Sequence, residues 1–217
     1  NSIESKVVVI GPPDVGKTCL SIRFVRGRFN EHCSTTIGAS FLMKTVTCGN
    51  VSNTMKIWDT AGQEVFRSMS ALYYKDVDGA ILVFDASNPD SMNSLDKWLA
   101  ELKSNNVGRE FAVMLACNKI DLAKTLNRDA VTRYAESIGA KAVFTSAKTG
   151  DGVTALFTSL SDSIVERRCA AASYAARSYG AEKPVSPSDV AASPEKKSCC
   201  CCSVSCNKHV MLPPSPR

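Results

Sequence analysis

The stretch KVVVIGPPDVGKT, residues 6–18, decides the fold. Its opening run KVVVI is typical of a buried β-strand in a sheet that is covered on both faces. The remainder fits the pattern G-x-x-x-x-G-K-[ST], in which backbone N–H groups and the start of a following helix surround phosphate groups. Residues 16–26 continue in a helical pattern, so the motif lies between a strand and a helix, as it requires. A chance match in a loop rich in Gly and Pro is the weaker interpretation.

Short apolar runs alternate with helical patterns through the rest of the first 165 residues. The loop CGNVSN between the second and third runs resembles a hairpin connection, which favours one antiparallel edge strand. The alternation predicts an α/β domain with a six-stranded, mostly parallel sheet and helices on both faces. Strands are expected at 6–10, 39–46, 54–58, 79–84, 111–117 and 141–145, and helices near 16–26, 65–75, 91–104, 127–138 and 152–167.

The composition is that of a globular domain with a basic tail. The 217 residues are 44% hydrophobic and 22% charged, which excludes a disordered, collagenous or coiled-coil chain. No apolar run reaches the length of about 18 residues that a membrane-spanning helix needs. Eight Lys/Arg and four Asp/Glu lie from residue 166 onward, which leaves 18 and 17 for residues 1–165. A domain so close to neutral lacks the basic face of a nucleic-acid binder, so no nucleic-acid partner is expected.

The ten cysteines form two groups. Five are scattered singly behind an N-terminus without a charged-then-apolar leader, which predicts reduced thiols in the cytosol. Between the groups, residues 170–198 show no periodicity and are expected to be a flexible linker. We therefore expect a folded domain over 1–168, a linker over 169–198 and a Cys-rich tail over 199–217. The second group lies in that tail: Cys199, Cys200, Cys201, Cys202 and Cys206.

Two motifs that follow later strands identify the nucleotide. NKID at residues 118–121 comes directly after an expected strand, at the sheet edge where ligands bind in such folds. The Asp121 carboxylate can accept from both N1–H and the 2-amino group of guanine, a donor pair that adenine lacks. SAK at residues 146–148 closes the last strand and adds a backbone N–H for guanine O6. An isolated NKxD is common in solvated loops, but its occurrence with SAK and the phosphate loop predicts a guanine nucleotide.

A third motif, DTAGQ at residues 59–63, is placed to sense the γ-phosphate. The Gly62 N–H would touch that phosphate, Gln63 would orient the attacking water, and Lys17 would reach the β- and γ-phosphates. Such contacts need the third phosphate, so its loss would release the loops that carry them, which predicts a binding switch. The expected catalytic residues are Gln63, Lys17 and Thr36, and the expected Mg²⁺ ligands are Thr18, Thr36 and, through water, Asp59.

With these motifs in place, residues 5–168 resemble a small GTPase of the Ras superfamily, and specifically the Rab family. The Rab-like signatures are IGASF at 37–41, WDTAGQE at 58–64 and the Tyr pair at 73–74. TTIGASF, YYKDVDGAILVFD, NKIDL and YAESIGAKAVFTSAK are most similar to the early-endosomal Rabs. The resemblance implies the P-loop NTPase fold of small GTPases. It also implies a GTP-binding, GTP-hydrolysing switch for endosomal vesicle traffic that is slow without an activating protein.

The resemblance also implies particular site residues and partners. Phe29 matches the aromatic that packs on the guanine, and an effector surface is expected at Ile37, Phe41, Trp58 and Tyr73. Core packing is the alternative for the three aromatic members of that surface. The implied partners of this monomeric switch are an exchange factor, an activating protein, effectors and a GDP-dissociation inhibitor or escort protein. The expected GTP-binding residues are Asp14, Val15, Gly16, Lys17, Thr18, Cys19, Phe29, Thr36, Gly62, Asn118, Lys119, Asp121, Ser146, Ala147 and Lys148.

Three positions depart from the family pattern. Pro13 replaces the usual Gly or Ser and lacks an N–H, so its ring could crowd Gln63 or an incoming Arg from an activating protein. Asp14 adds a negative charge near the phosphates, and Cys33 replaces an aromatic residue of the loop before Thr36. GTP binding is expected to persist, whereas a weakly or non-hydrolysing docking module is the alternative function. A P-loop nucleotide kinase is disfavoured because the run from 29 to 41 is too short for an Arg-rich lid.

The Cys-rich tail is a candidate for lipidation. It would hold the protein on the cytoplasmic face of endosomal membranes, cycling with the cytosol. Eleven residues follow Cys206 and no C-a-a-X box closes the chain. Palmitoylation, prenylation of internal cysteines and a chain end misplaced beyond the true one therefore all stay open. A zinc site with His209 is disfavoured, because adjacent cysteines do not match the C-x₂₋₄-C spacing.

Overall fold

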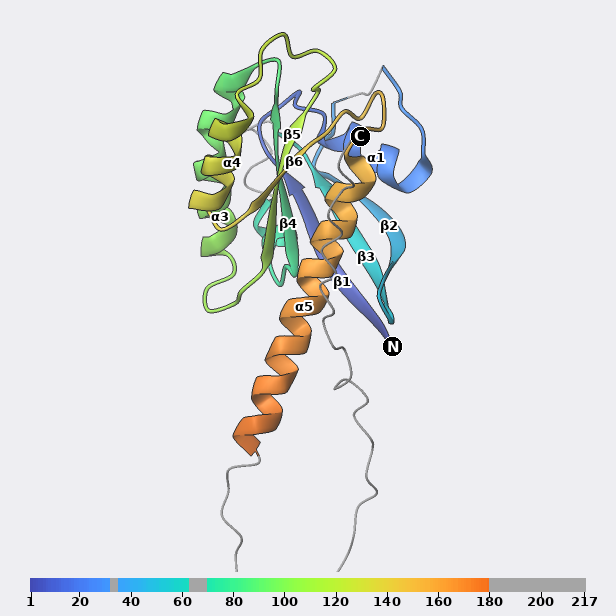
Figure 1. Ribbon diagram of the computed structural model, residues 1–217, viewed down its shortest axis with the longest axis vertical. Helices are drawn as coiled ribbons and strands as arrows, with labels where there is room; N and C mark the ends of the chain where they lie inside the picture. Colours follow the sequence, from blue (N-terminus) through green and yellow to red (C-terminus); the bar gives the residue numbers. More distant parts are fainter. Residues whose placement is uncertain (32–34, 63–69, 180–217) are drawn as a thin grey trace, which may run out of the picture. The chain divides into compact units, whose positions relative to one another are not determined.

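The computed structural model describes residues 1–31, 35–62 and 70–179. Six strands form one sheet in the order β2-β3-β1-β4-β5-β6 (Figure 1). All neighbouring strands pair in parallel except β2 and β3, which confirms the mostly parallel sheet with one antiparallel edge strand. The strands are β1 (Ser2–Ile10), β2 (Ala39–Cys48), β3 (Val51–Thr60), β4 (Gly79–Asp85), β5 (Ala112–Asn118) and β6 (Lys141–Phe144).

The strands at the antiparallel side of the sheet are longer than their apolar runs. β1 begins at Ser2 because its polar first half pairs in parallel with β3, from Ser2 opposite Ser52 to Ser5 opposite Met55. β2 and β3 meet in a tight turn at Gly49, whose φ of 57° suits a residue without a Cβ. The hairpin connection is therefore two residues long rather than the six of CGNVSN.

The helices differ from expectation mainly at their ends. The segment expected as one helix over 91–104 is divided, because Pro89 opens a 3₁₀ turn before α3 starts at Leu95. Of the helix expected at 65–75, residues 65–69 lie outside the described residues. The observed helices are α1 (Lys17–Arg26), α2 (Ser70–Tyr74), the 3₁₀ helix η2 (Pro89–Ser94), α3 (Leu95–Ser104), α4 (Arg128–Ser137) and α5 (Val153–Tyr179).

Helix α5 corrects the expected boundary of the linker. It ends at Tyr179 rather than near 167, so residues 169–179 are helical. The chain separates into compact units over 1–168 and 169–217, and the continuation of the helix belongs to the second. Ala is the strongest helix former, which explains why the Ala-rich residues after Arg168 remain helical without an apolar stripe. Within the described residues, no helix combines the length and apolarity that crossing a bilayer demands.

The sheet of the first unit separates two apolar cores. Alternate strand residues such as Val7 and Val9 pack on one face against α1 and α5, where Phe24 and Phe157 stack with ring centroids 4.0 Å apart. Val8 and its alternates pack on the other face with α2, α3 and α4. Figure 1 shows α3 and α4 on one side of the sheet and α1 and α5 on the other. Strands covered on both faces leave only their ends and the following loops free to bind a ligand.

Candidate functional site

The loops that follow the carboxyl ends of β1, β3, β5 and β6 enclose a cavity of about 370 Å³. The phosphate loop, NKID and SAK all contribute to its wall, together with the loop after α1, so segments far apart in the sequence converge on one site. The cavity is lined by Pro13, Asp14, Gly16, Lys17, Thr18, Cys19, Phe29, Asn30, Glu31, Thr35, Thr36, Thr60, Gly62, Asn118, Lys119, Asp121, Leu122, Ala147 and Lys148.

The phosphate loop surrounds the ammonium group of Lys17. Its Nζ donates to the carbonyl oxygens of Gly11 at 2.9 Å and Pro12 at 2.7 Å, and the residue is only 6% exposed. Burial lowers the pKa of Lys17 to about 8, although the nearby Asp59 and Asp14 act in the opposite direction. Gly16 has a φ of 88° and directly precedes α1, so the backbone turns the helix N-terminus toward the cavity. A phosphate group would therefore meet both a cation and helix N–H groups.

Three oxygen-bearing side chains fit a magnesium ion. The hydroxyl oxygens of Thr18 and Thr36 lie 2.9 Å apart, although 18 residues separate them in the sequence. Asp59 is fully buried, and its Oδ1 accepts no hydrogen bond from the described residues. Burial raises the pKa of Asp59, against hydrogen bonds from Thr18 and Ser40 and the charge of Lys17. A buried carboxylate oxygen without a partner beside two hydroxyls is the hard-oxygen environment that Mg²⁺ prefers.

Gly62 lies directly against the phosphate loop. A Cβ at this position would come within 2.5 Å of Lys17 Nζ and 2.6 Å of both the Pro12 oxygen and the Pro13 nitrogen. Only glycine therefore allows the loop after β3 to approach so closely. Pro13 lines the cavity at the same place, with a ring nitrogen that carries no hydrogen and cannot donate to a phosphate. The loop after β3 and the phosphate loop therefore lie against each other at Gly62.

The residues expected to bind the base form a second group at the same cavity. Asp121 accepts from the Ser146 hydroxyl through Oδ1 at 2.6 Å, which fixes the carboxylate that is expected to bind guanine. Asn118 donates to the Val15 carbonyl at 2.8 Å, so it joins the base site to the phosphate loop. The Ala147 N–H donates to Asn118 Oδ1 at 3.3 Å. Val15 and Ser146 do not line the cavity and act on it through these bonds.

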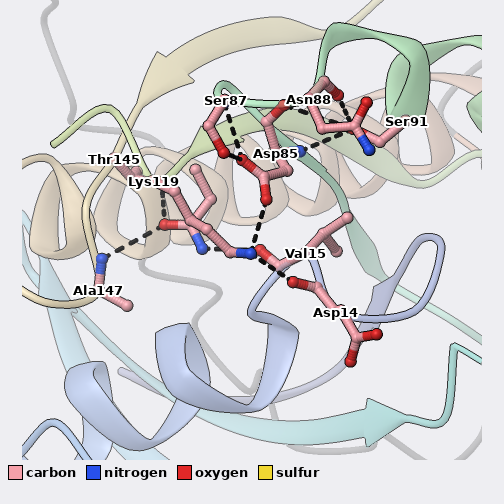
Figure 2. A network of polar contacts seen from close by, with 10 residues as sticks. Asp14, Val15, Asp85, Ser87, Asn88, Ser91, Lys119, Thr145 and Ala147 are labelled. Carbon is pink, nitrogen blue, oxygen red and sulfur yellow. Dashed lines mark hydrogen bonds and ion pairs between the residues drawn. The ribbon is translucent and has the colours of Figure 1, made fainter. Parts of the chain in front are cut away.

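Lys119 joins the same two loops through a network that Figure 2 shows in close-up. Its Nζ donates to the Asp14 carbonyl oxygen and to Asp85 Oδ2, both at 2.6 Å. Asp85 also accepts from the backbone N–H of Ser87 at 2.8 Å and from its hydroxyl at 2.6 Å. Burial acts to raise the pKa of Asp85, but the bonds from Lys119 and Ser87 together leave that pKa below its usual value. Asp14 and Lys119 both have positive φ, at 59° and 62°.

An ion pair joins two residues of the cavity wall. Lys148 Nζ lies 3.0 Å from Glu31 Oε1, which connects the SAK loop to the segment after α1. The hydrogen bond with Glu31 raises the pKa of Lys148. Both side chains are more than half exposed, so this pair contributes little to folding stability. Both residues line the same cavity as Phe29 and Asp121.

A group of apolar side chains lies close in sequence to Thr36 and Gly62 of the cavity wall. The ring of Trp58 lies 5.0 Å from that of Phe41 and 5.3 Å from that of Tyr73, measured between centroids. Phe41 is 47% exposed, so this trio is not fully buried core. Ile37 and Leu72 expose 80% and 75% of their surface. A contacting aromatic group that is partly exposed favours a protein interaction site.

Most of the site residues expected from the sequence therefore meet at one cavity. Gln63, Cys33 and the five tail cysteines lie outside the described residues. Two residues of the site, Glu31 and Asp85, are not expected from the sequence motifs. Asp85 ends β4 as Asn118 ends β5, and that shared place at a strand's carboxyl end is the signal that would have identified it. Among the described residues, no group of His, Cys, Asp and Glu side chains forms a metal cluster.

Comparison with known proteins gives a consistent result. The model of the Ras family matches residues 6–166. Ras-related protein Rab-5B of Plasmodium falciparum is 42% identical over 164 residues, which cover 75% of this chain and 78% of that protein. Rab-31 of Rattus norvegicus is 45% identical over 165 residues, or 74% of this chain and 83% of the relative. Rab-21 of Homo sapiens is 41% identical over 163 residues, or 74% and 72% respectively.

Proposed function

The chain belongs to the Ras family and is a GTPase of the Rab type, and from this premise we propose that it switches endosomal vesicle traffic through a γ-phosphate-dependent contact between its loops. The observation that carries the proposal is the approach of Thr36 and Gly62 to the phosphate loop. Thr36 contacts Thr18, and Gly62 contacts the loop at Lys17. A third phosphate placed between them would hold both loops, and its loss would release them.

Guanine is selected at the other end of the cavity. Asp121, fixed by Ser146, presents its carboxylate to N1–H and the 2-amino group, and Phe29 packs on the base. The Ala147 N–H, which donates to Asn118 Oδ1 in this structure, donates to guanine O6 when the nucleotide is bound. Asp121→Asn replaces one acceptor oxygen with an amide donor, which suits the 2-oxo group of xanthine. The variant is expected to lose GTP affinity by at least about 100-fold and to gain affinity for XTP. Unchanged binding of GTP would contradict this assignment.

Hydrolysis is an in-line attack of water on the γ-phosphorus, with cleavage of the bond to the β–γ bridging oxygen and release of GDP and phosphate. Lys17 neutralises charge that develops on the phosphate oxygens. The Gly62 N–H donates to a γ-phosphate oxygen, and Gln63 orients the attacking water. Pro13 offers no N–H at this place but leaves those donors intact. We therefore expect slow hydrolysis in the protein alone.

A magnesium ion would be held by the hydroxyls of Thr18 and Thr36 and, through water, by the buried Asp59. When bound, it neutralises the charge of the β- and γ-phosphates. A bound ion would also lower the electrostatic cost of burying Asp59, whose Oδ1 accepts no hydrogen bond from the described residues.

The apolar surface at Ile37, Phe41, Trp58 and Tyr73 recruits effectors in the GTP-bound state. It adjoins Thr36 and Gly62, so the nucleotide that orders these residues also shapes the surface beside them. The same loops receive the exchange factor and the activating protein. An activating protein that inserts an Arg would have to pass the Pro13 ring. The obstruction is measured by single-turnover GTP hydrolysis of the native protein and of Pro13→Gly, each with and without that partner.

The tail places the switch on the cytoplasmic face of endosomal membranes. Cys199, Cys200, Cys201, Cys202 and Cys206 are the candidate lipid attachment sites, and two lipid chains suffice for stable anchoring. A GDP-dissociation inhibitor or escort protein would shield those lipids when the monomeric protein returns to the cytosol. Mass spectrometry of protein from its native cell tests this directly, and a tail without lipid on any of the five cysteines would contradict it.

A further inference from the structure

The loop that reads the base is held by hydrogen bonds that converge on Ser146. The Ser146 hydroxyl donates to Asp121 at 2.6 Å and accepts from the Thr149 N–H at 3.1 Å. The Ser146 carbonyl oxygen accepts from the Gly150 N–H at 2.8 Å. Any displacement of Thr149 or Gly150 is therefore passed through Ser146 to the carboxylate that selects guanine.

The guanidinium of Arg23, which lies outside the cavity, forms a hydrogen bond with this loop. Arg23 lies in α1, and its Nη2 donates to the Thr149 carbonyl oxygen at 3.0 Å across 126 residues of sequence. Its Nη1 donates to the Gly27 carbonyl oxygen at 3.1 Å, at the end of the same helix. The planar guanidinium thus uses its fixed pair of donors to join the end of α1 to the base-reading loop.

Gly150 makes room for this contact. A Cβ at Gly150 would lie 2.9 Å from Nη2 and 3.1 Å from Nε of Arg23, and the φ of Gly150 is 94°. A side chain at this position would strain the loop and displace the guanidinium. The contact between Arg23 and the loop can therefore be perturbed from either side, by a substitution at Arg23 or at Gly150.

We propose that Arg23 is a positioning residue for guanine recognition, acting through Thr149 and Ser146 on Asp121. Arg23 does not line the cavity, so it acts without touching the nucleotide. Its helix begins at Lys17, next to the phosphates, and ends where Arg23 holds the base-reading loop. One helix thereby sets the separation between phosphate binding and base binding. The inference rests on the proposed function and adds a specificity residue to it.

The test compares the release of GDP with that of IDP, which keeps N1–H and O6 but lacks the 2-amino group. The full chain is loaded with each nucleotide, and dissociation is followed in excess unlabelled GTP. Arg23→Met is expected to speed GDP release about fivefold, the loss of one partly exposed charged hydrogen bond. IDP already lacks a bond to Asp121, so its release should change less than twofold. The ratio of the IDP release rate to the GDP release rate therefore falls in Arg23→Met.

The matched control is Arg26→Met, which replaces an exposed arginine in the last turn of the same helix and should change neither release rate.

A merely structural role for Arg23 predicts a different result. Loss of helix or domain stability would speed the release of both nucleotides by the same factor. Equal acceleration, or no change, would overturn the proposal. Arg23→Lys keeps the positive charge but has a single donor nitrogen in place of the planar guanidinium pair, so its rate ratio should lie between those of the native protein and Arg23→Met. Gly150→Ala perturbs the contact from the loop side and should lower the ratio even where Arg23→Met does not fold. A native protein that releases GDP and IDP equally fast would instead refute guanine recognition itself.

Discussion

Replacement of Asp85 by Asn is the sharpest perturbation of the nucleotide site that avoids the nucleotide itself. Asp85 does not line the cavity, yet its carboxylate holds Lys119, which lines it. Lys119 also donates to the carbonyl oxygen of Asp14, so these bonds hold the NKID segment, which we propose binds the base, against the phosphate loop (Figure 2). Asn has nearly the same shape as Asp and keeps one acceptor oxygen, so the substitution removes charge without creating a cavity.

The magnitude follows from the geometry of the pair. The Nζ–Oδ2 distance is 2.6 Å, and the side chains of Lys119 and Asp85 are 29% and 12% exposed. A hydrogen bond between two charged groups at such partial burial contributes roughly 1.5 kcal/mol, which corresponds to about a tenfold change in an equilibrium or a rate. The pKa of Asp85 is below its usual value in the folded protein. The contribution is therefore complete above about pH 4 and is lost as the pH falls through the lowered pKa.

Release of fluorescent GDP at neutral pH measures the effect. Asp85→Asn should release GDP about tenfold faster than the native protein. Asp96→Asn is the matched control, because it removes an exposed carboxylate of α3 that accepts a hydrogen bond from the Tyr134 hydroxyl of α4. Equal release rates for native protein and Asp85→Asn would refute the reasoning that Asp85 supports the site through Lys119.

Three further substitutions probe the remaining contacts of the cavity. Asp14→Gly removes the strain of a non-glycine residue at a left-handed φ of 59°, so the free energy of unfolding measured by thermal denaturation should rise by about 1 kcal/mol. It also removes a negative charge beside the phosphates, so GDP release should slow. Gly62→Ala would bring a Cβ within 2.5 Å of Lys17 Nζ, so single-turnover GTP hydrolysis should fall at least about tenfold while GDP affinity stays near native. Glu31→Gln breaks the exposed pair with Lys148, which should speed GDP release less than about fivefold and only at low salt, as a salt titration would show.

The sheet could be predicted from sequence because its central strands are unbroken apolar runs. Polar residues extend β1 from Ser2 to Ser5, and their pairing with β3 determines that they form a strand. No local sequence pattern predicts this pairing. The error in α5 has a different cause. The residues after Arg168 show no helical periodicity, but Ala-rich sequence is helical by intrinsic propensity even without an apolar face.

The site was predicted where a residue's role depends on its neighbours in sequence. Lys17 and Asp121 lie within motifs whose spacing places them, and the structure brings both to one cavity. Asp85, Glu31 and Arg23 act through partners at least 34 residues away, as the bond from Lys119 to Asp85 illustrates. Such partners are set by the packing of loops and helices, so a sequence motif cannot contain them.

The central claim is that the chain hydrolyses GTP at a γ-phosphate site built from the phosphate loop, Thr36 and the DTAGQ segment. Its most direct test is single-turnover conversion of bound GTP to GDP with Mg²⁺, in native protein and in Gln63→Leu. We predict conversion in the native protein at a rate on the order of 10⁻⁴ s⁻¹, and a rate at least about tenfold lower in Gln63→Leu. Stable GTP in the native protein, or equal rates in the two proteins, would contradict the account.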